Sequence, residues 1–448
     1  MATCDTVDTD TRQLRRISLA SYVGSAIEFY DFFIYGTAAA LVFPQVFFPE
    51  LGHVMATTAS LGAFASAFLA RPVGAAVFGH FGDRIGRKHV LVITLMLMGI
   101  ATVGVGLIPS TASIGIAAPL LLIGLRLVQG FAVGGEWAGA ALMSTEHAPE
   151  GRRGFFSMFT QLGLGTALVL SNFVFLVVHA AFGGSGSAFY QWGWRIPFLF
   201  SAVLIGTALY IRLKVKESPE FTDQEPVPHE GTPFAELIRA QGRQVLLAGG
   251  AAICAPMLVF QAGTFFTHFA AEHMGYSMNL VLLVSMIGGV FATVFAAVTA
   301  ILSDTYGRRR VALCSFALAA PWSLLVFPLV ESRDHVVFAA AIMVTYALIG
   351  ACIGPMAAFL PEIFAARYRY TGAALSHTMG AIVGGALPPV LSPMLIVDYG
   401  GWAVAAMMGG LGVISLVCVV ALPETAGRSL TARATRRGSS VTASRTSR

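Results

Sequence analysis

Long apolar stretches separated by short polar segments dominate the chain. A helix needs about 20 apolar residues to cross a hydrocarbon core of roughly 30 Å, and twelve stretches meet that length. They cover about 18–47, 56–79, 89–109, 113–138, 155–181, 192–212, 244–269, 278–302, 311–330, 335–359, 372–397 and 401–422. We therefore predict an all-α membrane protein with 12 transmembrane helices in two six-helix halves.

The composition supports a multi-pass membrane protein. Of the 448 residues, 56% are hydrophobic and only 11% are charged, whereas soluble proteins carry about 25% charged residues. The 48 glycines suit close helix packing in lipid. The five cysteines form no CxxC pair and no metal-ligand spacing is visible, so we expect no metal and no cofactor.

Basic residues are distributed unevenly between the two sides of the predicted helices. If the N-terminus is inside, cytoplasmic segments hold 24 of the 28 Lys and Arg; Arg71, Arg126, Arg195 and Arg333 are the exceptions. This positive-inside pattern predicts a plasma (inner) membrane protein with both termini cytoplasmic. The net charge of +5 is thereby explained by orientation, and we expect no nucleic-acid partner.

The polar segments predict the domain boundaries. We expect a cytoplasmic N-terminus (1–17), an N-terminal six-helix bundle (18–212), a cytoplasmic linker (213–243), a C-terminal six-helix bundle (244–424) and a disordered cytoplasmic tail (425–448). The linker is rich in Pro, Gly and charge, with a short amphipathic helix expected around 234–240.

The two halves carry similar motifs at corresponding places. "GHFGDRIGRKH" follows the second predicted helix and "AILSDTYGRRRV" follows the eighth, and aligning their aspartates gives an offset of 221 residues. Such a repeat is typical of transporters that bind their substrate between two halves. Each Asp is expected to accept hydrogen bonds at a helix N-terminus, where the dipole favours negative charge. The predicted conformational latch comprises Gly82, Asp83, Gly86, Arg87, Lys88, Asp304, Gly307 and Arg308.

Charged residues inside the apolar stretches are the strongest functional signal. Glu28 and Asp31 lie in the first stretch, and Arg71 and Arg126 lie about halfway along the second and fourth. Each charge at bilayer depth costs roughly 2.5–3.5 kcal/mol on insertion scales, so these residues are expected to be paired, protonated or open to water. A compensated cluster in the N-terminal half is the structural interpretation. The functional one is that Asp31 or Glu28 carries a proton, with Glu136 as third candidate.

An arginine beside a proline suggests how a substrate is held. Pro72 interrupts the helical hydrogen bonds after Arg71, and a guanidinium binds a carboxylate through two parallel hydrogen bonds. Arg71 is therefore the first candidate for binding an anionic substrate and Arg195 the second. Further predicted contacts are Tyr30, Tyr35 and Gln261.

Several motifs resemble those of a known family. "GHFGDRIGRK" is similar to the loop signature of the major facilitator superfamily, and "RLVQG", which contains Arg126 and Gln129, to its fourth-helix motif. "IEFYDFFIYG", "ARPVGAAVFGHFGDRIGRK", "RLVQGFAVGGEWAGA" and "GWRIPF" resemble the metabolite:proton symporter branch, which includes proline/betaine, alpha-ketoglutarate, citrate and shikimate transporters. The second loop signature departs from the pattern, with Ser303 where a Gly is expected. The resemblance assigns Arg126 and Gln129 to structure or coupling.

The resemblance and the buried charges together imply a secondary active transporter. We expect proton-coupled uptake of a small organic acid or zwitterionic metabolite by alternating access. No GxSxG, HExxH or Walker loop indicates an enzyme or an ATP-driven pump. A proton-coupled sugar porter is the alternative, because "ESPEF" and "PETAGR" are similar to sugar-porter motifs. A drug/proton antiporter is disfavoured, because "QLGLGTALVL" lacks the expected Gly-Pro pair.

Overall fold

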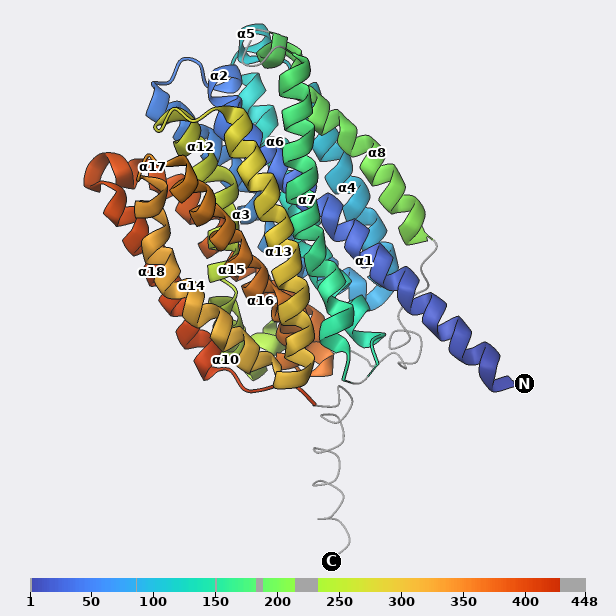
Figure 1. Cartoon of the computed structure of the whole chain (residues 1–448). Coiled ribbons are helices and arrows are strands. Elements are labelled where there is room, and N and C mark those ends of the chain that lie inside the picture. Colours follow the sequence, from blue (N-terminus) through green and yellow to red (C-terminus); the bar gives the residue numbers. More distant parts are fainter. Residues whose placement is uncertain (1, 86, 150, 183–187, 214–232, 428–448) are drawn as a thin grey trace, which may run out of the picture.

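The computed structural model describes residues 2–85, 87–149, 151–182, 188–213 and 233–427, and these residues are almost entirely helical without a strand. Figure 1 shows two groups of helices, one drawn in blue to green and one in yellow to red. The first group comprises α1 (Ala2–Leu41), α2 (Phe43–Phe47), α3 (His53–Ile85), α4 (Arg87–Leu107), α5 (Thr111–Ile114), α6 (Ala117–Glu146), α7 (Arg153–Ala181), η1 (Phe189–Gly193) and α8 (Arg195–Leu213).

The second group contains the C-terminal half of the chain. It comprises α10 (Pro233–Ala251), α11 (Cys254–Phe260), η2 (Gln261–Phe265), α12 (Phe266–Glu272), α13 (Met278–Tyr306), α14 (Arg308–Val330), α15 (His335–Ile363), η3 (Ala366–Tyr368), α16 (Arg369–Gly380), η4 (Ala381–Ala386), α17 (Leu387–Tyr399) and α18 (Gly401–Ala421).

The long helices agree with the twelve predicted crossings. Eleven segments of the described residues are long and apolar enough to span a membrane, and α1 packs among them against α7 and α8 as the twelfth. Helix α1 begins at Ala2, well before the predicted start at residue 18. Its first residue and the end of the described chain after α18 lie at the same end of the bundle (Figure 1), which we call the terminus-bearing end.

Three crossings are interrupted rather than continuous. The first run ends as α1 and resumes as the short helix α2, with Pro44 in its first turn, where no helical N–H is needed. The π-helical turns η2 and η4 interrupt the crossings built from α10–α12 and α16–α17. In α10, non-helical Gln241 separates the apolar crossing from the short helix predicted at 234–240.

Small residues allow neighbouring helices to approach within each half. On α6, a Cβ at Gly130 would overlap the backbone carbonyl of Ala67 on α3. In the opposite direction, a Cβ at Gly74 would overlap the carbonyl of Phe131. The two helices therefore touch through their backbones, which packing in lipid favours because dispersion replaces the hydrophobic drive.

The two halves meet along α7 and α13, which lie side by side in Figure 1. A Cβ on Gly165 of α7 would come within 2.5 Å of the carbonyl oxygen of Gly289 on α13. One turn earlier, Gln161 donates a hydrogen bond to the carbonyl oxygen of Ile353 on α15, at 3.0 Å. Positions 154, 157, 161 and 165 of α7 follow helical spacing, so one face of this helix is turned toward the C-terminal half.

Some predictions fall on parts of the chain that are not described. The first loop signature is one of them: Gly86 lies outside the described residues, as do the surroundings of Gly82 and the side chains of Asp83 and Arg87. Lys88 is described, and its Nζ donates to the carbonyl oxygen of Leu213 at 2.9 Å. Most of the predicted linker and tail also lies outside the described residues, so the domain boundaries stay predictions.

Candidate functional site

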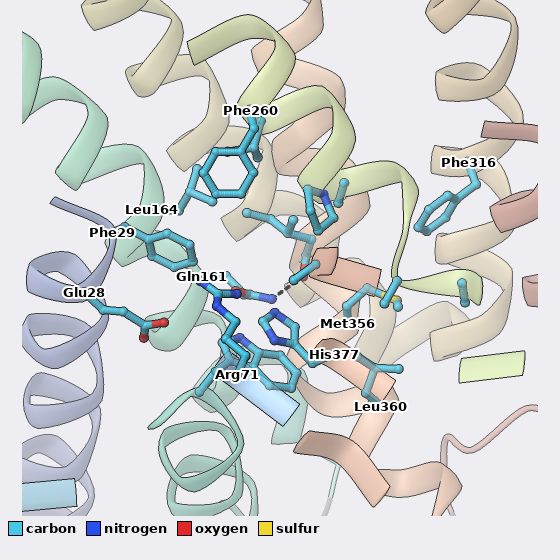
Figure 2. A pocket seen from close by; sticks show the side chains of 18 residues that line it. Glu28, Phe29, Arg71, Gln161, Leu164, Phe260, Phe316, Met356, Leu360 and His377 are labelled. Carbon is cyan, nitrogen blue, oxygen red and sulfur yellow. Dashed lines mark hydrogen bonds between the residues drawn. The ribbon is translucent and has the colours of Figure 1, made fainter. Parts of the chain in front are cut away.

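A cavity of about 60 Å³ lies between the two halves of the bundle. Figure 2 shows side chains from both halves converging on it. Its polar lining comprises Glu28 on α1, Arg71 on α3, Trp137 on α6, Gln161 on α7 and His377 on α16. The remaining lining is apolar, as is usual for pockets in which a few polar groups fix the orientation of a small molecule.

Arg71 supplies the cationic group of this cavity. It lies near the middle of α3, and its guanidinium carbon is 4.5 Å from the ring centre of Phe32 and 4.4 Å from that of Phe68. These rings attract the cation through their faces and hold it in place. Its Nε is buried and makes no hydrogen bond within the described residues. The charged fork therefore keeps a donor available for a bound acceptor.

The C-terminal half contributes an imidazole beside this arginine (Figure 2). His377 stacks on Trp137 of the N-terminal half, with ring centres 3.9 Å apart and planes 5° apart. The stack joins the two halves at the edge of the cavity. Glu28 also lines the cavity and acts electrostatically on Arg71. A guanidinium, a carboxyl group and two flat rings thus surround one small space.

The two acids of α1 have different surroundings, although they are three residues apart. Glu28 lines the cavity, whereas Asp31 is fully buried inside the N-terminal half. Asp31 accepts hydrogen bonds from Thr102 of α4 at 2.7 Å and from Ser201 of α8 at 2.8 Å. Residues at i and i+3 are separated by about 60° around a helix, which is enough to turn one carboxylate to the interface and the other to α4 and α8.

Arg126 reaches Asp31 through two intervening side chains. Its guanidinium donates to Gln129 Oε1, the Gln129 amide donates to Thr102 Oγ1 at 2.9 Å, and Thr102 donates to Asp31. Arg126 also donates to the carbonyl oxygen of Phe64 at 3.3 Å. The expected charge compensation is therefore indirect: within the described residues Asp31 and Arg126 form no ion pair, and a hydrogen-bonded chain connects them.

The other predicted substrate contacts do not line the cavity in this conformation. Tyr30 donates to the carbonyl oxygen of Pro197 at 3.0 Å. The ring of Tyr35 lies 4.0 Å from the guanidinium carbon of Arg126. Gln261 donates to Ser392 Oγ at 2.8 Å inside the C-terminal half. Each of these three contacts lies within one half, so a direct contact with substrate stays a prediction.

Arg195 lies at the end of the bundle away from the termini. It donates to the carbonyl oxygens of Gly106 at 2.9 Å and of Ile108 at 2.6 Å, where α4 ends. A cation at this position satisfies carbonyls that have no helical partner and interacts favourably with the helix dipole. Arg195 thus holds the end of α4 and does not line the cavity. Glu136 is buried on α6 and acts electrostatically on Asp31.

Hydrogen bonds close the interface at the terminus-bearing end. Asp304 accepts from the backbone N–H groups of Gly154 and Phe155, both at 2.8 Å, at the start of α7. Arg308 donates to the same carboxylate at 2.7 Å. Tyr370 donates to the carbonyl oxygen of Gly135 at 2.5 Å. Asp304 and Arg308 belong to the second loop signature and Tyr370 does not; the role of the signature as a latch stays a prediction.

The opposite end of the interface is also closed. His268 of α12 donates from Nδ1 to the carbonyl oxygen of Ala40 on α1 at 2.9 Å, and α17 packs against α3. Contacts between the halves are therefore present at both ends of the interface in this conformation.

Five residues of the site were not among the site residues predicted from the sequence. Thr102 and Ser201 are small polar residues common in membrane helices, and neither forms part of a motif. His377 lies among other polar residues of α16. A buried glutamine in an apolar run was a usable signal for Gln161, and Trp137 is next to Glu136 in "GGEW". The described residues contain no group of three or more His, Cys, Asp or Glu side chains that suits a metal ion.

Comparisons with known proteins agree with this architecture. The family model described as "Sugar (and other) transporter" matches residues 17–226 and 269–435. The inner membrane metabolite transport protein YhjE of Escherichia coli is 38% identical over 96% of this chain and 100% of its own length. The shikimate transporter of Escherichia coli is 36% identical, covering 86% and 89%. The proline/betaine transporter of Salmonella typhimurium is 32% identical, covering 94% and 86%.

A solved structure has the same fold. The proton:xylose symporter XylE of the major facilitator superfamily, bound to 6-bromo-6-deoxy-D-glucose, superposes with a TM-score of 0.75. The match covers 94% of this chain and 98% of that structure at 20% sequence identity. At this identity the likeness supports the two-half helical fold and carries no information about the substrate.

Proposed function

The chain belongs to the sugar (and other) transporter family of the major facilitator superfamily, and we propose that it imports a small organic acid or zwitterion together with protons. It is a membrane-spanning transporter of small molecules and not an enzyme. The proposed substrate class rests on the position of Arg71. Its side chain lines the cavity between the halves, and its buried Nε makes no hydrogen bond within the described residues.

The cavity favours a solute with a carboxylate. The Arg71 fork provides two parallel N–H donors for a carboxylate, and charge-assisted hydrogen bonds of this kind are roughly twice as strong as neutral ones. The imidazole of His377 lies beside it as a further partner. Glu28 on the same cavity suits the cationic group of a zwitterion. The shikimate and proline/betaine transporters among the relatives are named for carboxylate-bearing solutes.

The two acids of α1 are the proposed proton carriers. Glu28 lines the cavity and Asp31 lies within the adjoining hydrogen-bonded network. An ionisable residue held inside a membrane helix is expensive and in transporters serves ion or substrate pathways. Glu136, whose charge acts on Asp31, is the third candidate. Proton binding at these groups favours loading of the anion, since it offsets the charge that the substrate brings in.

Alternating opening of the two ends moves the substrate. The terminus-bearing end is the proposed cytoplasmic side, because that orientation puts most Lys and Arg inside. In this orientation the contacts of Asp304 with the start of α7 close the cytoplasmic side, and the contact of His268 with Ala40 closes the outer side. The protein is then an inner-membrane transporter with both termini in the cytoplasm.

Transport by the purified full-length protein in liposomes tests the proposal. Labelled shikimate, proline, betaine and xylose are supplied from the acidic side of an imposed pH gradient. We expect accumulation of at least one carboxylate-bearing solute, and loss of that accumulation when a protonophore is added. Accumulation of xylose alone would favour a sugar porter. Carboxylate uptake that ignores both the pH gradient and the protonophore would contradict proton coupling.

Substitution of Arg71 tests the substrate site. Arg71→Lys keeps the charge but lacks the planar fork, so KM for the transported carboxylate should rise about tenfold, which corresponds to about 1.4 kcal/mol. Arg71→Gln should abolish saturable uptake. Arg367→Lys is the matched control, because this half-exposed residue forms an ion pair with Glu236 away from the cavity. An unchanged KM in Arg71→Lys would exclude recognition by two parallel hydrogen bonds.

A further inference from the structure

The hydroxyl of Thr102 has two acceptors within reach but only one proton to donate. Its Oγ1 is 2.7 Å from Asp31 Oδ2 and 3.0 Å from the carbonyl oxygen of Met98, one turn earlier on α4. A hydroxyl carries one donor and two acceptor sites. The side chain can therefore donate to the carboxylate or to its own helix, and a rotation about one bond exchanges the two.

Arg126 fixes the direction of the hydrogen bonds behind Thr102. The guanidinium has only donors, so Gln129 must present Oε1 to it. The Gln129 amide nitrogen then faces Thr102 and donates to Oγ1 at 2.9 Å. One acceptor site of Thr102 is thus always occupied, and the other remains for Asp31.

Each protonation state of Asp31 satisfies every group in this chain in one orientation of the hydroxyl. When Asp31 is ionised, Thr102 donates to Oδ2 and Ser201 donates to Oδ1. When Asp31 carries a proton on Oδ2, that proton is donated to Thr102 Oγ1, and Thr102 donates to Met98 instead. No buried polar atom of the chain loses its partner, which matters because each such loss costs about 1–3 kcal/mol.

We propose that Thr102 is the positioning residue that allows Asp31 to bind and release a proton in the buried interior of the N-terminal half, by turning its hydroxyl between Asp31 and Met98. The inference rests on the proposed function, in which Asp31 is a candidate proton carrier. Thr102 exchanges no proton with substrate; it stabilises the carboxylate in one state and accepts from the carboxylic acid in the other.

The charges around Asp31 do not replace this function. Arg126 and Glu136 on α6 act on Asp31 with opposite signs, and Tyr30 interacts with it from α1. The contacts from α4 and α8 are the neutral hydroxyls of Thr102 and Ser201. Ser201 has Asp31 as its one described hydrogen-bond partner, so the connection to Arg126 runs through Thr102.

Infrared titration of the purified full-length protein tests the proposal without a known substrate. The carboxylic-acid C=O band that disappears in Asp31→Asn reports the protonation of this residue. Thr102→Val removes the hydroxyl and keeps the shape, so both protonation states of Asp31 lose a partner. The bond to the ionised carboxylate is the stronger of the two, so the midpoint of the band should move to higher pH by about one unit. Thr102→Ser keeps the hydroxyl and should titrate like the unmodified protein.

Thr94→Val is the matched control on the same helix. Thr94 is fully buried on α4 and donates to the carbonyl oxygen of Leu91 at 3.2 Å, without contact to Asp31. A midpoint in Thr102→Val equal to that in Thr94→Val overturns the inference but leaves proton-coupled transport intact. Absence of any Asp31-dependent band in the unmodified protein overturns both the inference and the assignment of Asp31 as a carrier. If Thr102→Val does not fold, a shifted midpoint in Thr102→Ser overturns the inference, and an unshifted one supports it.

Discussion

The contact of Asp304 with the start of α7 predicts a measurable change in how often the terminus-bearing end opens. The carboxylate accepts two backbone hydrogen bonds across the interface, each 2.8 Å long. Asp304→Asn removes the charge and leaves one acceptor oxygen, so one of the two is lost. A hydrogen bond to a charged group contributes about 1.5–3 kcal/mol. A loss of about 2 kcal/mol shifts the population toward the open conformation by about 30-fold.

Alkylation of a cysteine at position 157 measures this shift. Ser157 is fully buried one turn after Gly154, on the face of α7 turned toward the C-terminal half. In a protein lacking its native cysteines, Ser157→Cys should react only when the interface opens. Its rate should rise by about the same 30-fold when Asp304→Asn is added, provided that opening and closing are fast compared with alkylation.

Asp334→Asn provides the matched control for that experiment. Asp334 accepts from the backbone N–H groups of Val336 and Val337 at 2.7 and 3.1 Å, so it makes the same kind of contact with a helix N-terminus. That contact lies within one half of the molecule and at the other end of the bundle. Its loss should leave alkylation at position 157 unchanged. Equal alkylation rates with and without Asp304→Asn would refute the reasoning.

Three further predictions concern stability. Gly130→Ala should lower the thermal midpoint by several degrees, because overpacking costs about 1–3 kcal/mol; a midpoint equal to that of Gly62→Ala, where a Cβ meets no neighbour, would contradict the contact with α3. Arg195→Gln should lower stability, measured by chemical denaturation, without changing KM for a transported solute; a higher KM would place Arg195 in the substrate path. Burial raises the pKa of Glu424. Hydrogen bonds from the backbone N–H groups of Arg308, Arg309, Thr425 and Ala426 together lower it by a larger amount, so the net shift is downward. Its stabilising contribution is therefore present above the ordinary carboxyl pKa and lost as the pH falls through the lowered value, and Glu424→Gln should flatten that part of the stability–pH profile.

Helical crossings follow from sequence because they depend on local properties. Apolar length and the position of charges predicted the twelve crossings, and the resemblance carried by Arg126 and Gln129 pointed to the family. The interruption after Leu41 was missed, since a run of apolar residues reads as continuous whether or not Val42 adopts helical angles. The π turns were missed for the same reason: an i to i+5 hydrogen bond leaves no compositional signature.

The charged residues of the candidate site were predicted from the sequence, but the side chains that contact them were not. Arg71 and Glu28 stood out because charge is rare in such helices, and both line the cavity. The direction in which Asp31 points depends on where α4 and α8 pack, which helical spacing alone does not fix. Thr102 and His377 belong to other helices, and only the tertiary arrangement brings them beside Asp31 and Arg71.

The π turns of the C-terminal half make the number of residues in these helices a structural constraint, independent of which side chains they carry. In η2, the five residues from Gln261 to Phe265 follow a wider coil than the α-helices on either side. Because a π turn accommodates one extra residue within a helix, rewinding all five residues as ordinary α-helix would rotate α12 by about 100° relative to α11. His268 would then leave Ala40, and the closure at the end away from the termini would fail although every side chain of the cavity survived. A homologue that has an ordinary helix at η2 and keeps this contact should therefore have one residue fewer there.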